Sequence, residues 1–213
     1  NRVRRQRQMC IRDRNILITG SNGFIGKNLK VRLEKNKKFN IIDFNRENSE
    51  DDLFKAVLEA ETIIHLAGEN RPKSIEAFGE ANHMLTKKLC KFCKEKDTKT
   101  HIIFSSSTQV EQDNPYGKSK LAAEDELLEL NKSSKNSVSI FRFPGVFGKW
   151  CRPNYNSVVA TFCYYLIRDK KINIYDKDKN KKIKLIYIDD LVDYFIKVIE
   201  TYPILKTNYK IIN

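Results

Sequence analysis

Tyr116 and Lys120, four residues apart at the start of a helix-like stretch, are the pair in this sequence best suited to proton transfer. Their spacing places both side chains on one face of a helix. A phenol has an ordinary pKa of about 10, and a neighbouring ammonium lowers it. Tyr116 is therefore predicted to exchange a proton with an alcohol or ketone oxygen. Ser105–Ser107 ends the preceding strand-like run, and a hydroxyl there can hydrogen-bond the same oxygen.

A glycine-rich turn, Gly20–Gly26, directly follows the apolar run 16–19 and opens a second helix-like stretch. The free N–H groups at such a helix N-terminus attract a pyrophosphate. Gly20 allows the tight turn, Gly23 lets the backbone approach the phosphates, and Gly26 lets the helix pack close to its strand. The turn predicts a dinucleotide site.

The end of the second predicted strand bears on which dinucleotide binds. Asn45 stands where an acidic residue would bind the ribose hydroxyl of NAD, and Arg46 follows it. The charge and forked donors of an arginine suit a 2′-phosphate. NADPH/NADP is therefore expected, while Asp43, on the same face as Asn45, is the competitor that keeps NAD as the alternative.

Short apolar runs alternate with helical patterns over residues 15–148, which is typical of βαβ units and a parallel sheet. The predicted fold is α/β, a Rossmann-type doubly wound parallel sheet with a small C-terminal substrate lobe. Predicted strands are 15–19, 39–44, 62–66, 101–105 and 137–143, and predicted helices are 24–35, 51–60, 74–94 and 116–130.

The substrate lobe is expected mainly over 149–188 and 203–213, beyond the cofactor-binding core of about 15–148. It includes a helix at 156–168, extended runs at 171–175 and 184–188, and a lysine-rich loop at 176–182. A helix at 189–200 is expected to have Asp189 or Asp190 as its N-cap. The chain ends within a strand-like run, so it is expected to be a fragment.

The net charge of +13 is concentrated at the N-terminus, because residues 1–14 carry six arginines and one aspartate. Residues 9–14 resemble a translated transposon-end adapter, so 1–14 are expected to be a non-native leader. The remaining +8 suits an acidic small molecule, and its lysines fall mainly in turns. No nucleic-acid partner is predicted.

Five cysteines, an odd number, favour a reducing compartment and hence the cytoplasm over a disulfide scaffold. Cys90 and Cys93 form a C-x-x-C within a predicted helix with no second pair, so no metal is expected. No apolar run reaches the ~18 residues of a membrane span, and no secretory signal is visible. No membrane association is predicted.

Taken in order, these residues resemble the extended branch of the short-chain dehydrogenase/reductase superfamily, the NAD-dependent epimerase/dehydratase family. The resemblance covers essentially residues 15–213. The motifs that carry it are Thr19-Gly20-x-x-Gly23-x-x-Gly26, His65-Leu66-Ala67-Gly68, Ser105-Ser106-Ser107, Tyr116-x-x-x-Lys120, Arg142-x-Pro144-x-Val146-Phe147-Gly148 and Tyr187-Ile188-Asp189-Asp190-Leu191.

The resemblance implies a nucleotide-sugar oxidoreductase with a catalytic set of Ser107, Tyr116, Lys120 and Asn82. It implies hydride transfer to a sugar carbonyl and a homodimer paired through helices 74–94 and 116–130. The cofactor-binding residues are expected to be Gly20, Asn22, Gly23, Phe24, Ile25, Gly26, Asn45, Arg46, Leu66, Ala67, Gly68, Tyr116, Lys120 and Pro144. Gly145 and Ile183 depart from the family pattern, so the charge for a UDP pyrophosphate is expected from Lys149, Arg152 or Lys184. Asn156 matches a position that contacts the nucleotide in relatives.

The segment 147–163, with Asn70-Arg71-Pro72 and 112–117, is similar to reductase domains of bifunctional capsular-polysaccharide enzymes. This likeness implies NADPH-dependent reduction of the C4 ketone of a UDP-4-keto-6-deoxy-hexosamine, on the route to UDP-N-acetyl-L-fucosamine. It also implies a C-terminal cupin domain that this sequence lacks. Two alternatives stay open: a UDP-sugar 4-epimerase or dehydratase with tightly bound NAD, and a non-catalytic dinucleotide-sensing module.

Overall fold

The computed structural model describes residues 14–70, 74, 78–96, 98–174, 182–201 and, for the backbone alone, 209–212. Most of the leader, Arg71-Pro72 and most of the lysine-rich loop lie outside the described residues. Arg14 was assigned to the leader, but it is the first residue of strand β1 (Arg14–Thr19), and its N–H donates to the carbonyl of Lys38 at 3.0 Å.

Six strands form one sheet in the order β2-β1-β3-β4-β5-β8, and every neighbouring pair is parallel. The chain runs outward from β1 to β2 and then returns to β3 on the other side of β1. This reversal confirms the predicted doubly wound sheet. The strands after β1 are β2 (Phe39–Phe44), β3 (Thr62–His65), β4 (His101–Ser107), β5 (Ser137–Phe143) and β8 (Tyr209–Ile212).

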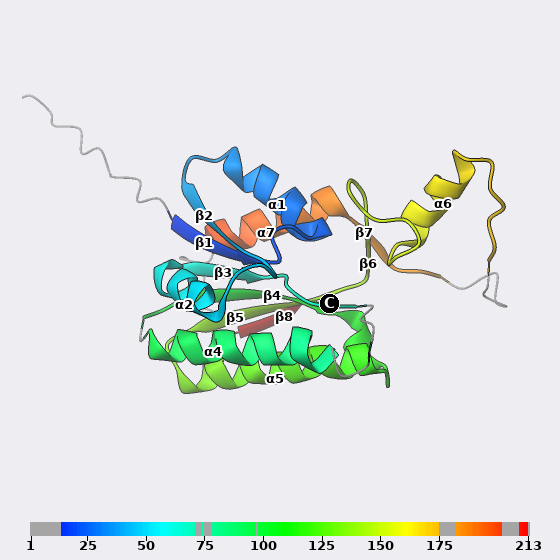
Figure 1. The fold of residues 1–213 in the computed structure, drawn as a ribbon. Helices are drawn as coiled ribbons and strands as arrows, with labels where there is room; N and C mark the ends of the chain where they lie inside the picture. Colours follow the sequence, from blue (N-terminus) through cyan, green and yellow to red (C-terminus); the bar gives the residue numbers. More distant parts are fainter. Residues whose placement is uncertain are drawn as a thin grey trace, which may run out of the picture.

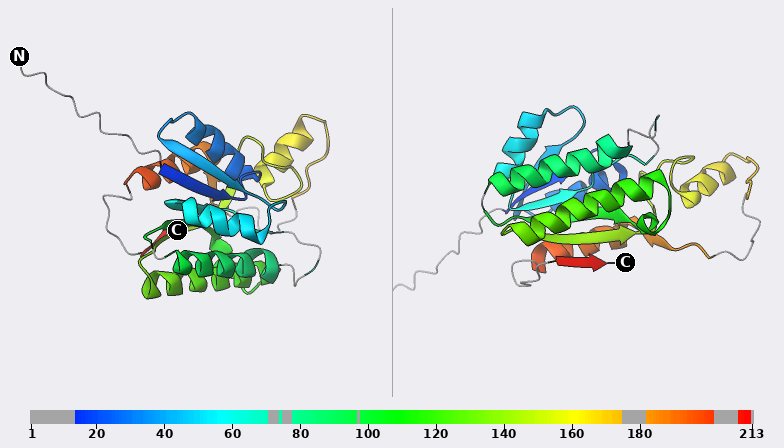
Figure 2. Two further views of the ribbon diagram at one scale, coloured as in Figure 1. Left: turned by 60° about the vertical axis from the view of Figure 1, so that its left-hand side comes forward. Right: turned by 90° about the horizontal axis from the view of Figure 1, so that it is seen from below.

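Helices cover both faces of the sheet (Figure 1; Figure 2). On one face lie α1 (Phe24–Glu34) and α7 (Ile188–Thr201), and on the other lie α2 (Glu50–Glu59), α4 (Leu85–Glu95) and α5 (Pro115–Ser133). Strand side chains alternate between the two cores, as the pleat requires. Leu17 packs on the α2/α4/α5 side, while Ile16 and Ile18 pack on the α1/α7 side.

The small lobe is built around a second, two-stranded sheet. Strand β6 (Gly145–Phe147) pairs in parallel with β7 (Leu185–Tyr187), and α6 (Val158–Leu166) stands apart from the central sheet. The expected strand at 171–175 is not formed by its described residues, 171–174. Strand β8 pairs with β5 in the central sheet, although its residues were expected in the lobe.

Two further differences concern element boundaries. The helix expected from residue 74 is described as a π-helical segment, η1 (Gly79–Met84), that continues into α4. Helix α7 begins at Ile188, so Asp189 and Asp190 lie in its first turn and neither is the N-cap. There they still complement the positive end of the helix dipole. Among the described residues, no helix is both long and apolar enough to cross a bilayer.

Candidate active site

A groove of about 1840 Å³ follows the carboxyl edge of the central sheet and continues beneath the small lobe. Ligands of open parallel sheets bind at this edge. Sixteen of the residues predicted from the sequence line the groove: Gly20, Asn22, Gly23, Phe24, Ile25, Gly26, Asn45, Arg46, Leu66, Ala67, Gly68, Ser107, Tyr116, Pro144, Arg152 and Asn156. Asn82 and Lys120 lie buried behind its wall.

The first turn of α1 lines this groove, and no side chain caps its backbone N–H groups. Its N-cap is Gly23, no side chain caps it, and the first turn carries no acidic residue. By contrast, α2 is closed by a capping box between Ser49 and Asp52. The N-terminus of α1 is therefore the one of these two that is left available for an anion.

Glycine is required at two positions of the turn, because neighbouring backbone atoms leave no space for a Cβ. Gly20 has a φ of +73°, and a Cβ on it would lie 2.9 Å from the backbone of Ala67. A Cβ on Gly26 would lie 2.4 Å from the carbonyl oxygen of Gly20 and 2.7 Å from the Cα of Ser21. Side chains there would fill the turn, so the residues present fit a dinucleotide pyrophosphate.

Asn45 ties the glycine turn to the end of β2. Its Oδ1 accepts from the N–H of Asn22 at 2.9 Å, and its Nδ2 donates to the hydroxyl of Ser21 at 2.9 Å. The sequence assigned Asn45 to the cofactor ribose. In the structure its amide is committed to the turn, although the residue also lines the groove.

Arg46 lies at the same groove, and its guanidinium forms an ion pair with Glu69. Asp43, the competing ribose ligand, instead forms an ion pair with Lys30 and does not line the groove. The basic residue, not the acidic one, therefore faces the predicted adenosine end of the site.

His65, at the end of β3, links β3 to β1 and to α4 through hydrogen bonds of its ring. It is fully buried, with Nδ1 2.7 Å from the hydroxyl of Thr19 and Nε2 2.9 Å from the hydroxyl of Thr86. Burial lowers the pKa of His65 to about 3, and the nearby Lys120 charge acts in the same direction. His65 is thus a neutral structural residue that positions Leu66, Ala67 and Gly68.

Asn82, from η1, supports the segment just after β3. Its Oδ1 accepts from the N–H of Glu69, and its Nδ2 donates to the carbonyl of Glu69, both at 2.9 Å. Nδ2 also donates to the hydroxyl of Ser119 on α5 at 3.0 Å. The predicted fourth catalytic residue therefore joins η1, α5 and the groove wall, and it is buried.

Lys120 is buried, and its ammonium donates to the carbonyl of Ser105 at 2.8 Å. It also lies 4.7 Å from the ring centre of Phe104. Burial lowers the pKa of Lys120 to about 8, against an opposing effect of the Glu124 carboxylate.

Tyr116 differs from the sequence expectation in its proton affinity. Burial raises the pKa of its phenol above the usual value, a hydrogen bond with Ser107 opposes this rise, and Tyr155 adds to it. The expected lowering by Lys120 is not seen. Lys120 instead directs its ammonium to Ser105, so the phenol stays protonated to higher pH.

A buried ion pair beside this set was missed by the sequence reasoning. Glu124 receives a bidentate contact from Arg142, at 3.1 Å from Nε and 2.7 Å from Nη2, and a hydrogen bond from Ser106. It joins α5 to the ends of β4 and β5. The available signal was its position four residues after Lys120, which continues the Tyr116–Lys120 face.

Asn70 was identified from the sequence only as part of a motif, and no role in the site was predicted for it. It lines the groove, and its side-chain oxygen is buried without a hydrogen-bond partner among the described residues. Buried polar atoms are normally satisfied, so this acceptor is suited to a ligand donor.

The predicted substrate residues are divided by the structure. Arg152 and Asn156 are exposed and line the lobe side of the groove. Lys149 does not line it, and its ammonium lies 4.4 Å from the ring centre of Trp150. The neighbouring Tyr155, not singled out from the sequence, donates from its hydroxyl to Glu69 at 3.1 Å.

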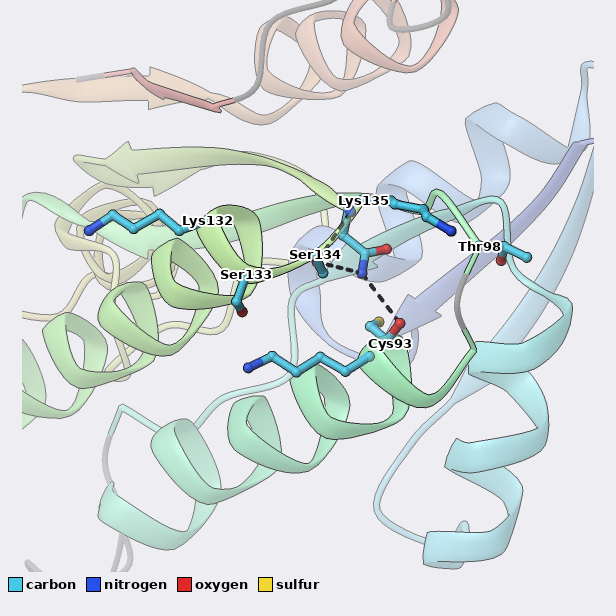
Figure 3. Close-up of a pocket in the computed structure, with 8 residues that line it drawn as sticks. Cys93, Thr98, Lys132, Ser133, Ser134 and Lys135 are labelled. Atoms are coloured by element: carbon cyan, nitrogen blue, oxygen red, sulfur yellow. Dashed lines mark hydrogen bonds between the residues drawn. The ribbon is translucent and has the colours of Figure 1, made fainter.

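A second hollow of about 460 Å³ lies at the opposite edge of the sheet, near the C-terminal ends of α4 and α5 (Figure 3). Asn136 closes it by donating to the carbonyl of Cys93 and to Ser134. Burial raises the pKa of the Cys93 thiol to about 12, so the thiol is unreactive. No group of three or more metal-ligating side chains occurs in the described part of the chain.

Comparisons with known proteins agree with this architecture. The model of the NAD dependent epimerase/dehydratase family matches residues 16–211. The chain is 44% identical to a UDP-2-acetamido-2,6-beta-L-arabino-hexul-4-ose reductase of Pseudomonas aeruginosa, over 87% of this chain and 49% of that protein. A dTDP-D-glucose 4,6-dehydratase of Dictyostelium discoideum is 28% identical over 84% of this chain and 54% of that protein.

Among solved structures, the capsular polysaccharide assembling protein CapF of Staphylococcus aureus is similar with a TM-score of 0.78 and 41% identity. The match covers 93% of this chain and 53% of that one. A UDP-glucuronic acid 4-epimerase of Bacillus cereus shares the fold, with a TM-score of 0.81 at 22% identity over 93% and 76% of the two chains.

The chain spans about half the length of the curated relatives it matches. Within that span, the parallel sheet, the glycine turn at its edge and the serine, tyrosine and lysine beside the groove all occur together. The chain belongs to the NAD dependent epimerase/dehydratase family.

Proposed function

We propose that this protein reduces the C4 ketone of a UDP-4-keto-6-deoxy-hexosamine with NADPH. The main support for this proposal is the position of Tyr116, which lies beside Ser107 in the groove. That groove extends from the glycine turn to the small lobe. A groove of this extent has room for a dinucleotide beside a nucleotide sugar. The name of the Pseudomonas aeruginosa relative, a UDP-2-acetamido hexul-4-ose reductase, supports reduction at C4 of a UDP-linked 2-acetamido sugar.

When bound, a reduced nicotinamide supplies the hydride for such a reduction. The chain itself supplies the proton and the polarisation of the ketone. Ser107 donates a hydrogen bond to the ketone oxygen, and Tyr116 transfers its phenolic proton to that oxygen as the alcohol forms. The raised pKa of Tyr116 suits this direction, because the phenol is protonated at neutral pH.

Lys120 supports the proton transfer from behind the groove wall. Lys120 lies one turn along α5 from Tyr116, and its ammonium donates a hydrogen bond to the carbonyl of Ser105. The ammonium does not lower the pKa of the resting phenol, so the proposal requires it to turn from Ser105 toward Tyr116 as the phenolate forms. Asn82 holds the groove wall through Glu69, and thereby positions the segment beside Lys120.

The choice of NADPH over NADH is supported by Arg46. It is the groove-lining basic residue at the end of β2, and Asp43 is engaged with Lys30 outside the groove. An arginine binds a phosphate dianion through charge-assisted hydrogen bonds. The glycine turn binds the pyrophosphate, with Leu66, Ala67, Gly68 and Pro144 lining the rest of the cofactor path.

For the UDP moiety, the proposal assigns the pyrophosphate to Arg152 and a nucleotide contact to Asn156. Both line the groove on the lobe side. Lys149 would have to leave the Trp150 ring to join them, so it is the weaker candidate. The unpartnered oxygen of Asn70 is assigned to a hydroxyl or amide donor of the bound molecules.

The wider proposal places this activity in capsular polysaccharide precursor synthesis, towards UDP-N-acetyl-L-fucosamine, in the cytoplasm. It includes a homodimer paired through the helices η1–α4 and α5. Met84 and Leu121 support this pairing, because they are large apolar side chains exposed on those helices. Sedimentation of the purified protein at several concentrations tests the homodimer directly.

The function is tested by incubating the protein with UDP- and dTDP-linked 4-keto sugars and following the loss of NADPH. The proposal expects turnover with a UDP-linked 4-keto-6-deoxy-hexosamine, and a slower reaction with the dTDP-linked sugars and with NADH. If the protein consumes NADH in clear preference to NADPH, the assignment of Arg46 to the 2′-phosphate is wrong.

A further inference from the structure

Glu69 lies where the two predicted ligand sites of the groove meet. Its carboxylate pairs with Arg46 from the end of β2 and accepts a hydrogen bond from Tyr155 of the small lobe at 3.1 Å. Its backbone N–H and carbonyl are both held by Asn82 at 2.9 Å. The position of this carboxylate is therefore fixed from three directions, and its side chain is only 16% exposed.

The two members of the ion pair are anchored very differently. The Arg46 side chain is 80% exposed, whereas Glu69 is held by the groove wall. Arg46 can therefore turn to another anion while the Glu69 carboxylate keeps its place. Tyr155 still donates to Glu69 after such a turn, so the carboxylate is not left buried without a donor.

We infer that Glu69 sets how strongly this site distinguishes NADP(H) from NAD(H), by competing with the 2′-phosphate for Arg46. The inference rests on the proposed role of Arg46 in binding that phosphate. A dianionic phosphate must take the guanidinium from Glu69 and then lie in the field of its negative charge. NAD(H) carries no phosphate there, so Glu69 leaves its binding unaffected.

The test measures the dissociation constants of NADP⁺ and NAD⁺ by titration calorimetry for the protein and four variants. These are Glu69→Gln, Arg46→Ala, the double variant, and Glu47→Gln as the matched control. Glu47 also lines the groove and adjoins Arg46 in sequence, so its substitution makes the same charge change.

The Arg46 side of this ion pair is exposed to solvent, which limits its strength, so Glu69→Gln is expected to tighten NADP⁺ binding about two- to fivefold, with NAD⁺ unchanged. The gain should be clearly smaller when Arg46 is already alanine, because the competition for Arg46 is then absent and only the repulsion between Glu69 and the phosphate remains. It should also shrink at high salt. Glu47→Gln should tighten NADP⁺ less than Glu69→Gln does.

Three results would overturn the inference: no tightening of NADP⁺ in Glu69→Gln, equal tightening in Glu47→Gln, or loss of NAD⁺ binding in Glu69→Gln. The last result would make Glu69 a support of the groove wall. A different result tests the proposed function: if Arg46→Ala binds NADP⁺ as tightly as the parent protein, Arg46 does not read the phosphate. If only the inference about Glu69 fails, Arg46→Ala should still bind NADP⁺ more weakly than the parent protein does.

Discussion

The ammonium of Lys120 donates a 2.8 Å hydrogen bond to the carbonyl oxygen of Ser105, two residues before Ser107. This contact joins α5, which also carries Tyr116, to the strand β4 whose end carries Ser107. Ser107 and Tyr116, the two residues predicted to act on one substrate oxygen, are thus linked through the elements that carry them by the bond that Lys120 makes. The same burial that makes this contact possible lowers the pKa of Lys120 to about 8.

That pKa predicts a pH dependence of turnover. Because Lys120 is a cation below about pH 8 and neutral above it, the rate of ketone reduction should fall as pH rises through about 8. Lys120→Met should be slow at every pH and lack this descending limb. A pH–rate profile of kcat for both proteins checks the prediction, and a parent profile that stays flat to pH 9.5 (about 1.5 units higher) would contradict it.

Replacing Tyr116 with phenylalanine removes the proton donor and preserves the ring. Turnover should drop by about 10²–10⁴-fold, the usual contribution of a positioned acid. NADP⁺ affinity should change little, because the glycine turn is untouched. Steady-state kinetics and cofactor titration on the same preparation measure the two effects. Near-parent turnover in Tyr116→Phe would remove the phenol from the mechanism.

The glycine turn offers a paired substitution. Gly26→Ala would place a Cβ 2.4 Å from the carbonyl oxygen of Gly20, where only a shift of backbone can relieve the clash. It should lower the affinity for NADP⁺ and NAD⁺ alike by at least about tenfold, and lower stability by roughly 1–3 kcal/mol. A Cβ on Gly79 meets nothing within 4 Å, so Gly79→Ala is the control and should bind both cofactors normally.

Cofactor titration and chemical denaturation distinguish the two glycine variants. Equal cofactor affinity in both would show that the turn tolerates a side chain, against the geometry described above.

His65 predicts a loss of stability in acid. Its pKa is about 3 in the folded protein and 6.5 when exposed, so the unfolded state binds more protons between these values. The stability it contributes is complete above pH 6.5 and falls as pH drops towards 3, by on the order of 5 kcal/mol. Urea unfolding at a series of pH values measures the loss. An NMR titration that placed the pKa of folded His65 near 6.5 would contradict it.

Much of the fold followed from sequence because its signals are local. The alternation of apolar strands and amphipathic helices predicted the sheet, the crossovers and the end of the groove that carries Ser107 and Tyr116. Strand β8 was misassigned because membership of a sheet depends on a partner about seventy residues away, here β5. No local pattern encodes such a pairing.

The electrostatics of the site were harder to predict for the same reason. The spacing of Tyr116 and Lys120 predicted their shared face, yet the direction of the Tyr116 pKa shift depends on burial and on Ser107. Glu69 and Tyr155 come from distant parts of the chain, and their hydrogen bond depends on how the lobe meets the sheet. Glu124 was missed as well, although its spacing from Lys120 was visible in the sequence.

The central claim is that this site reduces a nucleotide-sugar ketone with a cofactor that is exchanged at every turnover. The most direct measurement combines the absorbance spectrum of the purified protein with NADPH consumption in the presence of a UDP-4-keto-6-deoxy-hexosamine. The account predicts protein free of tightly bound cofactor and one NADPH oxidised for each C4 alcohol formed. Protein that retains NAD through purification and consumes no NADPH would contradict it, and would favour an epimerase or dehydratase.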